Sequence, residues 1–126
     1  MGVGMADAAF AIERLKKRPD FLACAQAASC ARGAVVVQAR ARGDDKSLVR
    51  AGFTATKKIG GAVQRNRAKR RMREAARLLL PQFARPGFDY VLIARGGVTT
   101  RAWDRLLDDV KSALIRLAAD RDRPAV

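Results

Sequence analysis

The sequence lacks histidine entirely and contains only two cysteines, Cys24 and Cys30. A zinc site takes its ligands mainly from Cys and His, and a cysteine nucleophile needs a neighbouring base, so neither kind of centre is expected. Proteins that cleave phosphodiesters by themselves commonly use histidines or metal-binding carboxylates. We therefore expect no catalytic residues and no protein-bound metal, and we expect both thiols to be reduced.

Long apolar runs are also missing. No eighteen consecutive apolar residues occur, so the sequence offers no candidate transmembrane helix. Its first ten residues are short for a secretory signal and carry no early positive charge, which favours a cytoplasmic location. We expect residues 1–13 to be a disordered extension, residues 14–119 a single folded domain, and residues 120–126 a frayed polar tail. Met5 leaves a later translation start open.

Acidic residues are scarce: 12 Asp and Glu stand against 26 Lys and Arg, which gives a net charge of +14. The excess is concentrated in residues 57–77, where nine basic residues accompany one acid, Glu74. Like charges three or four apart on a helix repel one another, so this cluster indicates an anionic partner, most simply a nucleic acid backbone. A solvated face and a disordered segment are the alternatives, and the apolar residues within the segment argue against disorder.

Other residues give weaker signals of chemistry. Asp104 and Asp108 lie four apart on a predicted helix among basic neighbours, which favours surface ion pairs over a metal site. Gly60 and Gly61 are not followed by the Gly-Lys-Ser/Thr ending of a P-loop, so nucleotide binding is not expected.

Periodicity and turn residues predict six elements. Helices are expected at residues 19–29, 65–83 and from about residue 100, where Thr100 would be the N-cap, and strands at 34–39, 49–56 and 90–94. The order α-β-β-α-β-α indicates a single small α+β domain with helices packed on one mixed sheet.

The second predicted helix separates its charge from its apolar side. One face carries residues at spacings of four, three and four, namely Ala68, Met72, Ala75 and Leu79. Near the opposite pole lie Asn66, Arg70, Arg73 and Arg77. The preceding glycines and the free amides of the helix start would add a place where phosphate oxygens can be received.

The segment that carries this cluster, Lys-Lys-Ile-Gly-Gly-Ala-Val-Gln-Arg-Asn-Arg-Ala-Lys-Arg-Arg-Met-Arg-Glu at residues 57–74, strongly resembles the protein subunit of bacterial ribonuclease P. Further matches occur at residues 14–17 (Arg-Leu-Lys-Lys), 20–21 (Asp-Phe), 50–53 (Arg-Ala-Gly-Phe) and 90–95 (Tyr-Val-Leu-Ile-Ala-Arg). The resemblance covers residues 14–118, nearly the whole predicted domain.

The resemblance implies a function in tRNA 5′ maturation. In that family a large RNA is the catalyst, and the small protein binds both this RNA and the 5′ leader of precursor tRNA. It implies a 1:1 complex with the RNA, Mg²⁺ for the RNA-catalysed reaction, no cofactor on the protein, no obligatory protein partner and no membrane. It also implies a left-handed β-α-β crossover, as in the ribosomal protein S5 domain 2-like fold, contrary to the usual right-handed rule.

Two binding surfaces follow from the resemblance, residue by residue. The catalytic RNA would contact Lys57, Lys58, Arg65, Asn66, Arg67, Lys69, Arg70 and Arg73. The leader would lie in a cleft between the first helix and the sheet that contains Phe21, Lys17, Thr54 and Thr56.

Unpaired RNA is bound by stacking and backbone charge, which suits Phe21 in the leader cleft, although simple core packing is an equally open interpretation of this residue. This chain has Ala25 and Val37 where family members commonly have a second phenylalanine and another aromatic residue, which predicts poorer stacking. Gly61 replaces a usual asparagine, so any hydrogen bond from that side chain is lost or supplied by water or backbone.

Composition alone also permits a general or ribosome-associated RNA chaperone without a catalytic RNA partner, and the motif at residues 57–74 is what separates the two. A sequence-specific DNA-binding module is less well supported, because the basic helix offers few side chains suited to base edges. A membrane-surface helix is disfavoured by an apolar face made mostly of alanine.

Overall fold

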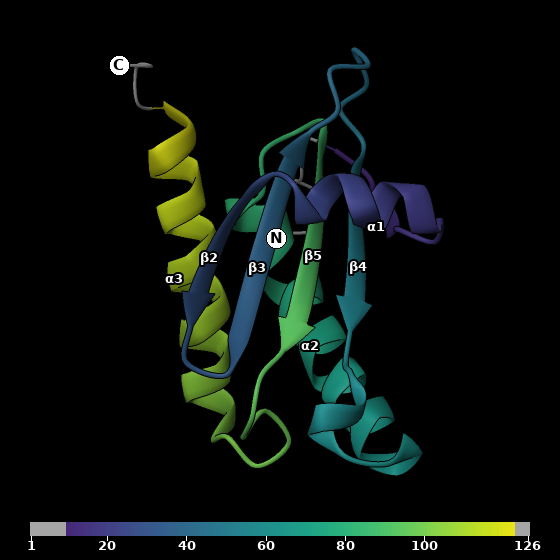
Figure 1. Ribbon diagram of the computed structural model, residues 1–126. Helices are drawn as coiled ribbons and strands as arrows, with labels where there is room; N and C mark the ends of the chain where they lie inside the picture. Colours follow the sequence, from purple (N-terminus) through teal and green to yellow (C-terminus); the bar gives the residue numbers. More distant parts are fainter. Residues whose placement is uncertain (1–9, 123–126) are drawn as a thin grey trace.

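The computed structural model describes residues 10–122, with side chains to residue 119 (Figure 1). The elements in chain order are β1 (Ile12–Arg14), α1 (Arg18–Ala25), β2 (Ala28–Arg32), β3 (Val35–Ala41), β4 (Val49–Thr54), the 3₁₀ turn η1 (Lys57–Ile59), α2 (Ala62–Phe83), β5 (Phe88–Ala94) and α3 (Trp103–Asp122). No helix within this part of the chain has the length and apolar character needed to cross a membrane.

The five strands form one mixed sheet in the order β1-β4-β5-β3-β2. β4 is parallel to both β1 and β5, whereas β3 is antiparallel to β5 and to β2. The long central strand β5 is buried along most of its length, as expected for the middle of a sheet covered on both sides. The predicted mixed α+β sheet is therefore confirmed.

Helices cover the two faces of the sheet unequally. α2 and α3 pack on one face, where the main core collects inward side chains such as Val37 and Leu92. The predicted buried face of the basic helix is confirmed, because Ala68 and Met72 are fully buried in that core. On the other face the short α1 covers a smaller cluster built around Cys24 and Val91.

The connection from β4 through α2 to β5 is left-handed, as the resemblance implied. In Figure 1 both strands run downward, β5 lies to the left of β4, and α2 crosses behind the sheet. A right-handed crossover would have placed this helix in front, where α1 lies. Because of the unusual hand, both long helices lie on one face, and α1 is the helix of residues 10–122 that covers the other.

The first helix is shorter than predicted, and an unpredicted strand follows it. α1 ends at Ala25, and residues 28–32 form β2, although 28 and 29 were predicted to be helical. The alanine-rich sequence favours a helix locally, but Cys30 lies opposite Val37 of β3 and is buried in the main core. Pairing with a neighbouring strand overrides this weak preference.

β1 is the second element that the sequence did not predict. All three of its residues are exposed, and they lie parallel to β4 with Glu13 opposite Arg50. Backbone hydrogen bonds at both ends extend the pairing, since the Val49 N–H donates to Ala11 and the Leu15 N–H donates to Ala51, each at 2.9 Å. A strand this short shows no periodicity. Residues 1–9 of the predicted extension lie outside the described chain.

β4 and the basic helix have different ends from those predicted. The strand stops at Thr54 rather than residue 56, because the chain turns into η1, in which the Ile59 N–H donates to Thr56 at 3.0 Å. α2 begins at Ala62 rather than residue 65, with Gly61 as its N-cap.

The last helix begins later than predicted, and Thr100 does not cap it. Its hydroxyl donates back to the Gly97 carbonyl at 3.4 Å, within a turn. The N–H of Leu106 donates to the Ala102 carbonyl at 2.9 Å, at the start of α3. The helix continues to Asp122, so residues 120–122 of the predicted tail are helical, and residues 123–126 lie outside the described chain.

Candidate nucleic-acid interface

The solvent-facing side of the first half of α2 is strongly basic, and we call it the basic face. A shallow depression there is lined by Val63, Asn66, Arg67, Lys69, Arg70 and Arg73. Five of the predicted RNA-contacting residues are thus brought together, and all are exposed except the half-buried Lys69. Val63 was not predicted, and its side chain is 79% exposed, which is unusual for a valine on a packed helix.

The two predicted lysines, Lys57 and Lys58, lie in η1, which contacts the start of α2. Both are exposed. Gly60 connects the turn to the helix with a φ of +137°, and a Cβ there would lie 3.0 Å from the Cβ of Gln64. Only glycine fits this turn without strain. The tight connection at Gly60 therefore keeps both lysines beside the basic face.

Two further arginines of the cluster, Arg65 and Arg71, lie at the edge of the buried face. Arg71 is structural: its guanidinium donates to the carbonyls of Val98 and Arg101 and lies 5.8 Å from the Trp103 ring centroid. Arg65 is half-buried, and its buried Nε has no hydrogen-bond partner among residues 10–122. The set of residues predicted to contact RNA contains Arg65 but not Arg71.

Phe21, which was predicted to line a leader cleft between the first helix and the sheet, packs where α1 meets the sheet. Phe21 packs against the smaller core cluster and directly over Gly52, where an added Cβ would lie 2.5 Å from the Phe21 Cζ. Phe21 is only partly buried, so it packs against the core and also keeps some exposed surface. Thr54 is half-buried and lies two residues beyond Gly52, on the same side of β4.

The other two residues predicted for the leader cleft lie apart from Phe21. Lys17 is exposed and lines a polar depression with Arg50 at the start of α1. Thr56 does not lie on the sheet, because β4 has ended; it is the exposed N-cap of η1, next to Lys57. Thr56 is therefore closer in the chain to the basic face than to Phe21.

A buried carboxylate that was not predicted from the sequence, Asp89, binds three arginines on the side of the sheet that α1 covers. Asp89 has no exposed surface and accepts hydrogen bonds from Arg42 at 2.9 Å and from Arg50 at 2.7 and 2.8 Å. Arg40 is a third partner, at 3.4 Å. Hydrogen bonding to Asp89 raises the pKa of Arg50 above its usual range. A single acid inside the apolar run of β5 was the signal in the sequence, since buried charges are nearly always paired.

Cys24 lies close to this network and is chemically quiet. Burial first, and the nearby Asp89 carboxylate second, raise the pKa of its thiol to about 11. A thiol of this kind stays protonated at neutral pH and is a poor nucleophile. Within residues 10–122 no cluster of three His, Cys, Asp or Glu side chains is placed to hold a metal ion.

Comparison with known proteins identifies the family. The ribonuclease P family model matches residues 11–118. The chain belongs to the ribonuclease P protein family. The ribonuclease P protein component of Caulobacter vibrioides is 71% identical over 111 residues, which cover 88% of this chain and 74% of that protein. The same component of Ruegeria pomeroyi is 53% identical over 112 residues, covering 87% and 90%.

Solved ribonuclease P proteins share the fold. The protein from Thermotoga maritima superposes with a TM-score of 0.69 at 30% identity, covering 82% of this chain and 96% of that one. The protein from Staphylococcus aureus gives the same TM-score at 26% identity, covering 83% and 94%. The chain is thus a subunit of the ribonucleoprotein enzyme ribonuclease P, and it assists the RNA of that enzyme in tRNA processing.

Proposed function

We propose that one copy of this chain binds one ribonuclease P RNA through the basic face and the adjoining η1 lysines. The observation that carries the proposal is a contrast in pairing. Arg42, Arg50, Arg77 and Arg101 are each ion-paired with a carboxylate. None of the cations proposed to contact the RNA has such a partner within residues 10–122, namely Lys57, Lys58, Arg65, Arg67, Lys69, Arg70 and Arg73.

The basic face acts by electrostatics. Like charges on one helix repel, and a phosphate backbone removes that cost while releasing condensed counterions. If about six phosphates are neutralised, the logarithm of affinity falls with the logarithm of salt concentration with a slope of about −4 to −5. The protein thereby reduces repulsion between the catalytic RNA and precursor tRNA, and it lowers the Mg²⁺ concentration that the RNA needs to fold and act.

The cleft beside α1 binds the 5′ leader of precursor tRNA. Phe21 offers a partly exposed ring for stacking, and the side chains of Arg40 and Arg50, each anchored to Asp89, remain about one third and one quarter exposed on the same side of the sheet. Lys17 adds an exposed cation at the start of α1. One ring with nearby cations suits unpaired RNA of varied sequence. Mg²⁺ serves the RNA-catalysed reaction, and the protein binds no cofactor of its own.

Reconstitution tests the proposal. The purified chain is mixed with a bacterial ribonuclease P RNA and 5′-labelled precursor tRNA at a Mg²⁺ concentration at which the RNA alone is nearly inactive. We expect 5′ cleavage to be restored, saturating at one protein per RNA. Failure to stimulate cleavage would rule out the proposed role. Cleavage by the protein alone, after nuclease removal of all RNA, would show that the chain carries catalytic groups of its own.

A further inference from the structure

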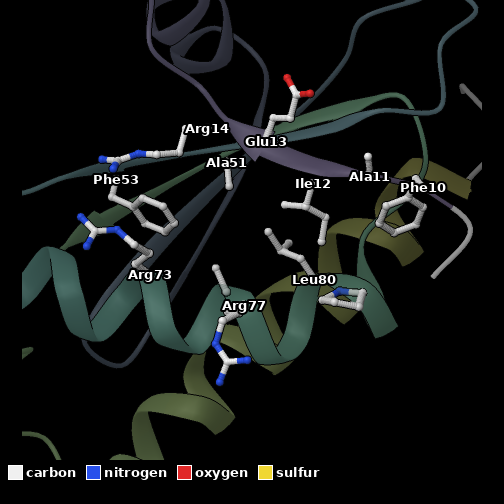
Figure 2. A pocket seen from close by; sticks show the side chains of 12 residues that line it. Phe10, Ala11, Ile12, Glu13, Arg14, Ala51, Phe53, Arg73, Arg77 and Leu80 are labelled. Atoms are coloured by element: carbon white, nitrogen blue, oxygen red, sulfur yellow. The ribbon is translucent and has the colours of Figure 1, made fainter. Parts of the chain in front are cut away.

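An apolar groove lies between the β1 edge of the sheet and α2, away from the cleft beside α1 (Figure 2). It has a volume of about 420 Å³. Its walls are apolar and come from three elements and the residues before β1: Phe10, Ile12, Ala51, Phe53, Leu80 and Pro81. Of the residues proposed above to contact RNA, only Arg73 lines this groove.

One end of the groove combines an aromatic ring with two cations. The Arg73 guanidinium carbon lies 5.9 Å from the centroid of the Phe53 ring, and Figure 2 shows Arg14 extending beside the same ring. Neither arginine is paired with a carboxylate among the described residues. Glu13, the one acid at the rim, directs its carboxylate away from α2.

The groove is also continuous with the basic face. Arg73 lines both the groove and the depression formed by Asn66 and Arg70. An RNA backbone lying on α2 therefore passes the mouth of the groove at Arg73. A nucleotide that is unpaired at this point can turn its base inward without the backbone leaving the cationic surface.

We propose that the groove binds one unpaired nucleobase of the ribonuclease P RNA, with the base against Phe53 and its flanking phosphates at Arg73 and Arg14. The proposal rests on the RNA-binding role of the basic face. Aromatic rings flanked by cations bind the bases of single-stranded RNA without strong sequence preference. A second copy of this chain is a poor occupant, because it would bring two sets of rim arginines together.

Replacing Phe53 by leucine tests the proposal, since leucine keeps apolar packing but removes the aromatic face. Phe83→Leu is the matched control, because Phe83 is also half-buried and has a cation, Lys111, 5.4 Å from its ring centroid, but does not line the groove. Affinity for a bacterial ribonuclease P RNA is measured by filter binding at several salt concentrations, with thermal unfolding of each variant.

We expect Phe53→Leu to weaken RNA binding about tenfold with an unchanged salt slope, and Phe83→Leu to bind as the parent does. Base-specific chemical probing should show an unpaired base that is protected by the parent and by Phe83→Leu but not by Phe53→Leu. Unchanged affinity and protection in folded Phe53→Leu would overturn the proposal. If Phe53→Leu changes only the mass of the protein measured by sedimentation, the groove binds a second copy of the chain instead.

The same measurements distinguish a wrong nucleobase site from a wrong RNA-binding role of the basic face. If the parent chain does not bind the RNA, or if a variant lacking Arg70 and Arg73 binds it normally, the RNA-binding role of the basic face is wrong. If that variant loses binding while Phe53→Leu behaves as the parent, only the nucleobase site is wrong.

Discussion

Arg50 of β4 donates two hydrogen bonds to Asp89 of β5, from Nε to Oδ1 at 2.8 Å and from Nη2 to Oδ2 at 2.7 Å. The third nitrogen of the same guanidinium, Nη1, donates to Asp20 of α1 at 3.2 Å. One arginine therefore links both strands of the left-handed crossover to the helix that covers the cleft. Arg40 and Arg42 form the other ion pairs of the fully buried Asp89.

Asp89→Asn should lower the free energy of unfolding by about 3 kcal/mol, because it leaves several arginines around one neutral amide in a buried site. Urea unfolding followed by circular dichroism measures the loss. Asp44→Asn is the control: Asp44 touches Arg42 from the exposed side of the network, and its removal should change stability little. Equal stability of Asp89→Asn and the parent would show that this ion-pair network does not hold the sheet together.

Replacing Arg70 and Arg73 together by alanine should weaken binding to ribonuclease P RNA and reduce the magnitude of the salt slope by about 1.5 to 2. Both side chains are exposed, and neither is ion-paired with a carboxylate within residues 10–122, so folding should change little. Arg32→Ala with Lys46→Ala makes the same change in net charge on exposed residues away from α2. If both double variants lose the same affinity, net charge rather than the basic face governs binding.

Phe21→Leu should weaken binding of precursor tRNA to the reconstituted enzyme about tenfold and leave binding of tRNA without a leader unchanged. Leucine keeps most of the packing in the smaller cluster, so the loss reports stacking. Binding assays with the two substrates separate these effects. Equal losses for both substrates would contradict the assignment of this residue to the leader.

Gly52→Ala should give the same substrate-selective loss without changing Phe21 itself. The added Cβ would lie 2.5 Å from the Phe21 Cζ and 3.2 Å from the Leu15 Cβ, so the ring must move. We expect a destabilisation of about 1 to 3 kcal/mol from this overpacking, measured by urea unfolding. A variant with parental stability and parental leader affinity would show that the ring is not confined by the sheet.

Stability should fall above pH 9 because of Cys24. The thiol has a pKa of about 11 in the folded chain and an ordinary value of 9.0 when unfolded. Between these values only the unfolded chain loses the proton, so stability falls by about 2 to 3 kcal/mol as pH rises and then levels off. Urea unfolding from pH 7 to 11 measures this, and Cys24→Ala should lack that part of the decline. Parallel curves would contradict the prediction.

Gly61→Asn should stabilise α2 by about 0.5 kcal/mol, because Gly61 is the N-cap and supplies no side-chain hydrogen bond to the helix. Its φ of −75° suits any residue, and nothing lies within 4 Å of an added Cβ. The thermal midpoint should rise slightly while RNA affinity stays within twofold. A lower midpoint would show that the glycine is needed for the turn from η1 into the helix.

The segregation of charge on α2 could be read from sequence because it depends on one local period. Ala68 and Met72 share a face wherever the segment is helical, and Arg70 and Arg73 then point away from it. The motif at residues 57–74 indicated the family, and the resemblance to that family implied the left-handed crossover. Local patterns of the same kind predicted the three helices and the central strands, with errors of a few residues at their ends.

Only the tertiary structure decided the features that join distant residues. β1 and β2 exist because longer strands pair with them, and their own sequences favour no strand. The partners of Asp89 come from β3, β4 and the loop after β3, and Phe53 meets Arg73 only because α2 crosses behind β4. Sequence periodicity records which side of an element is buried, whereas these contacts depend on which elements the fold brings together.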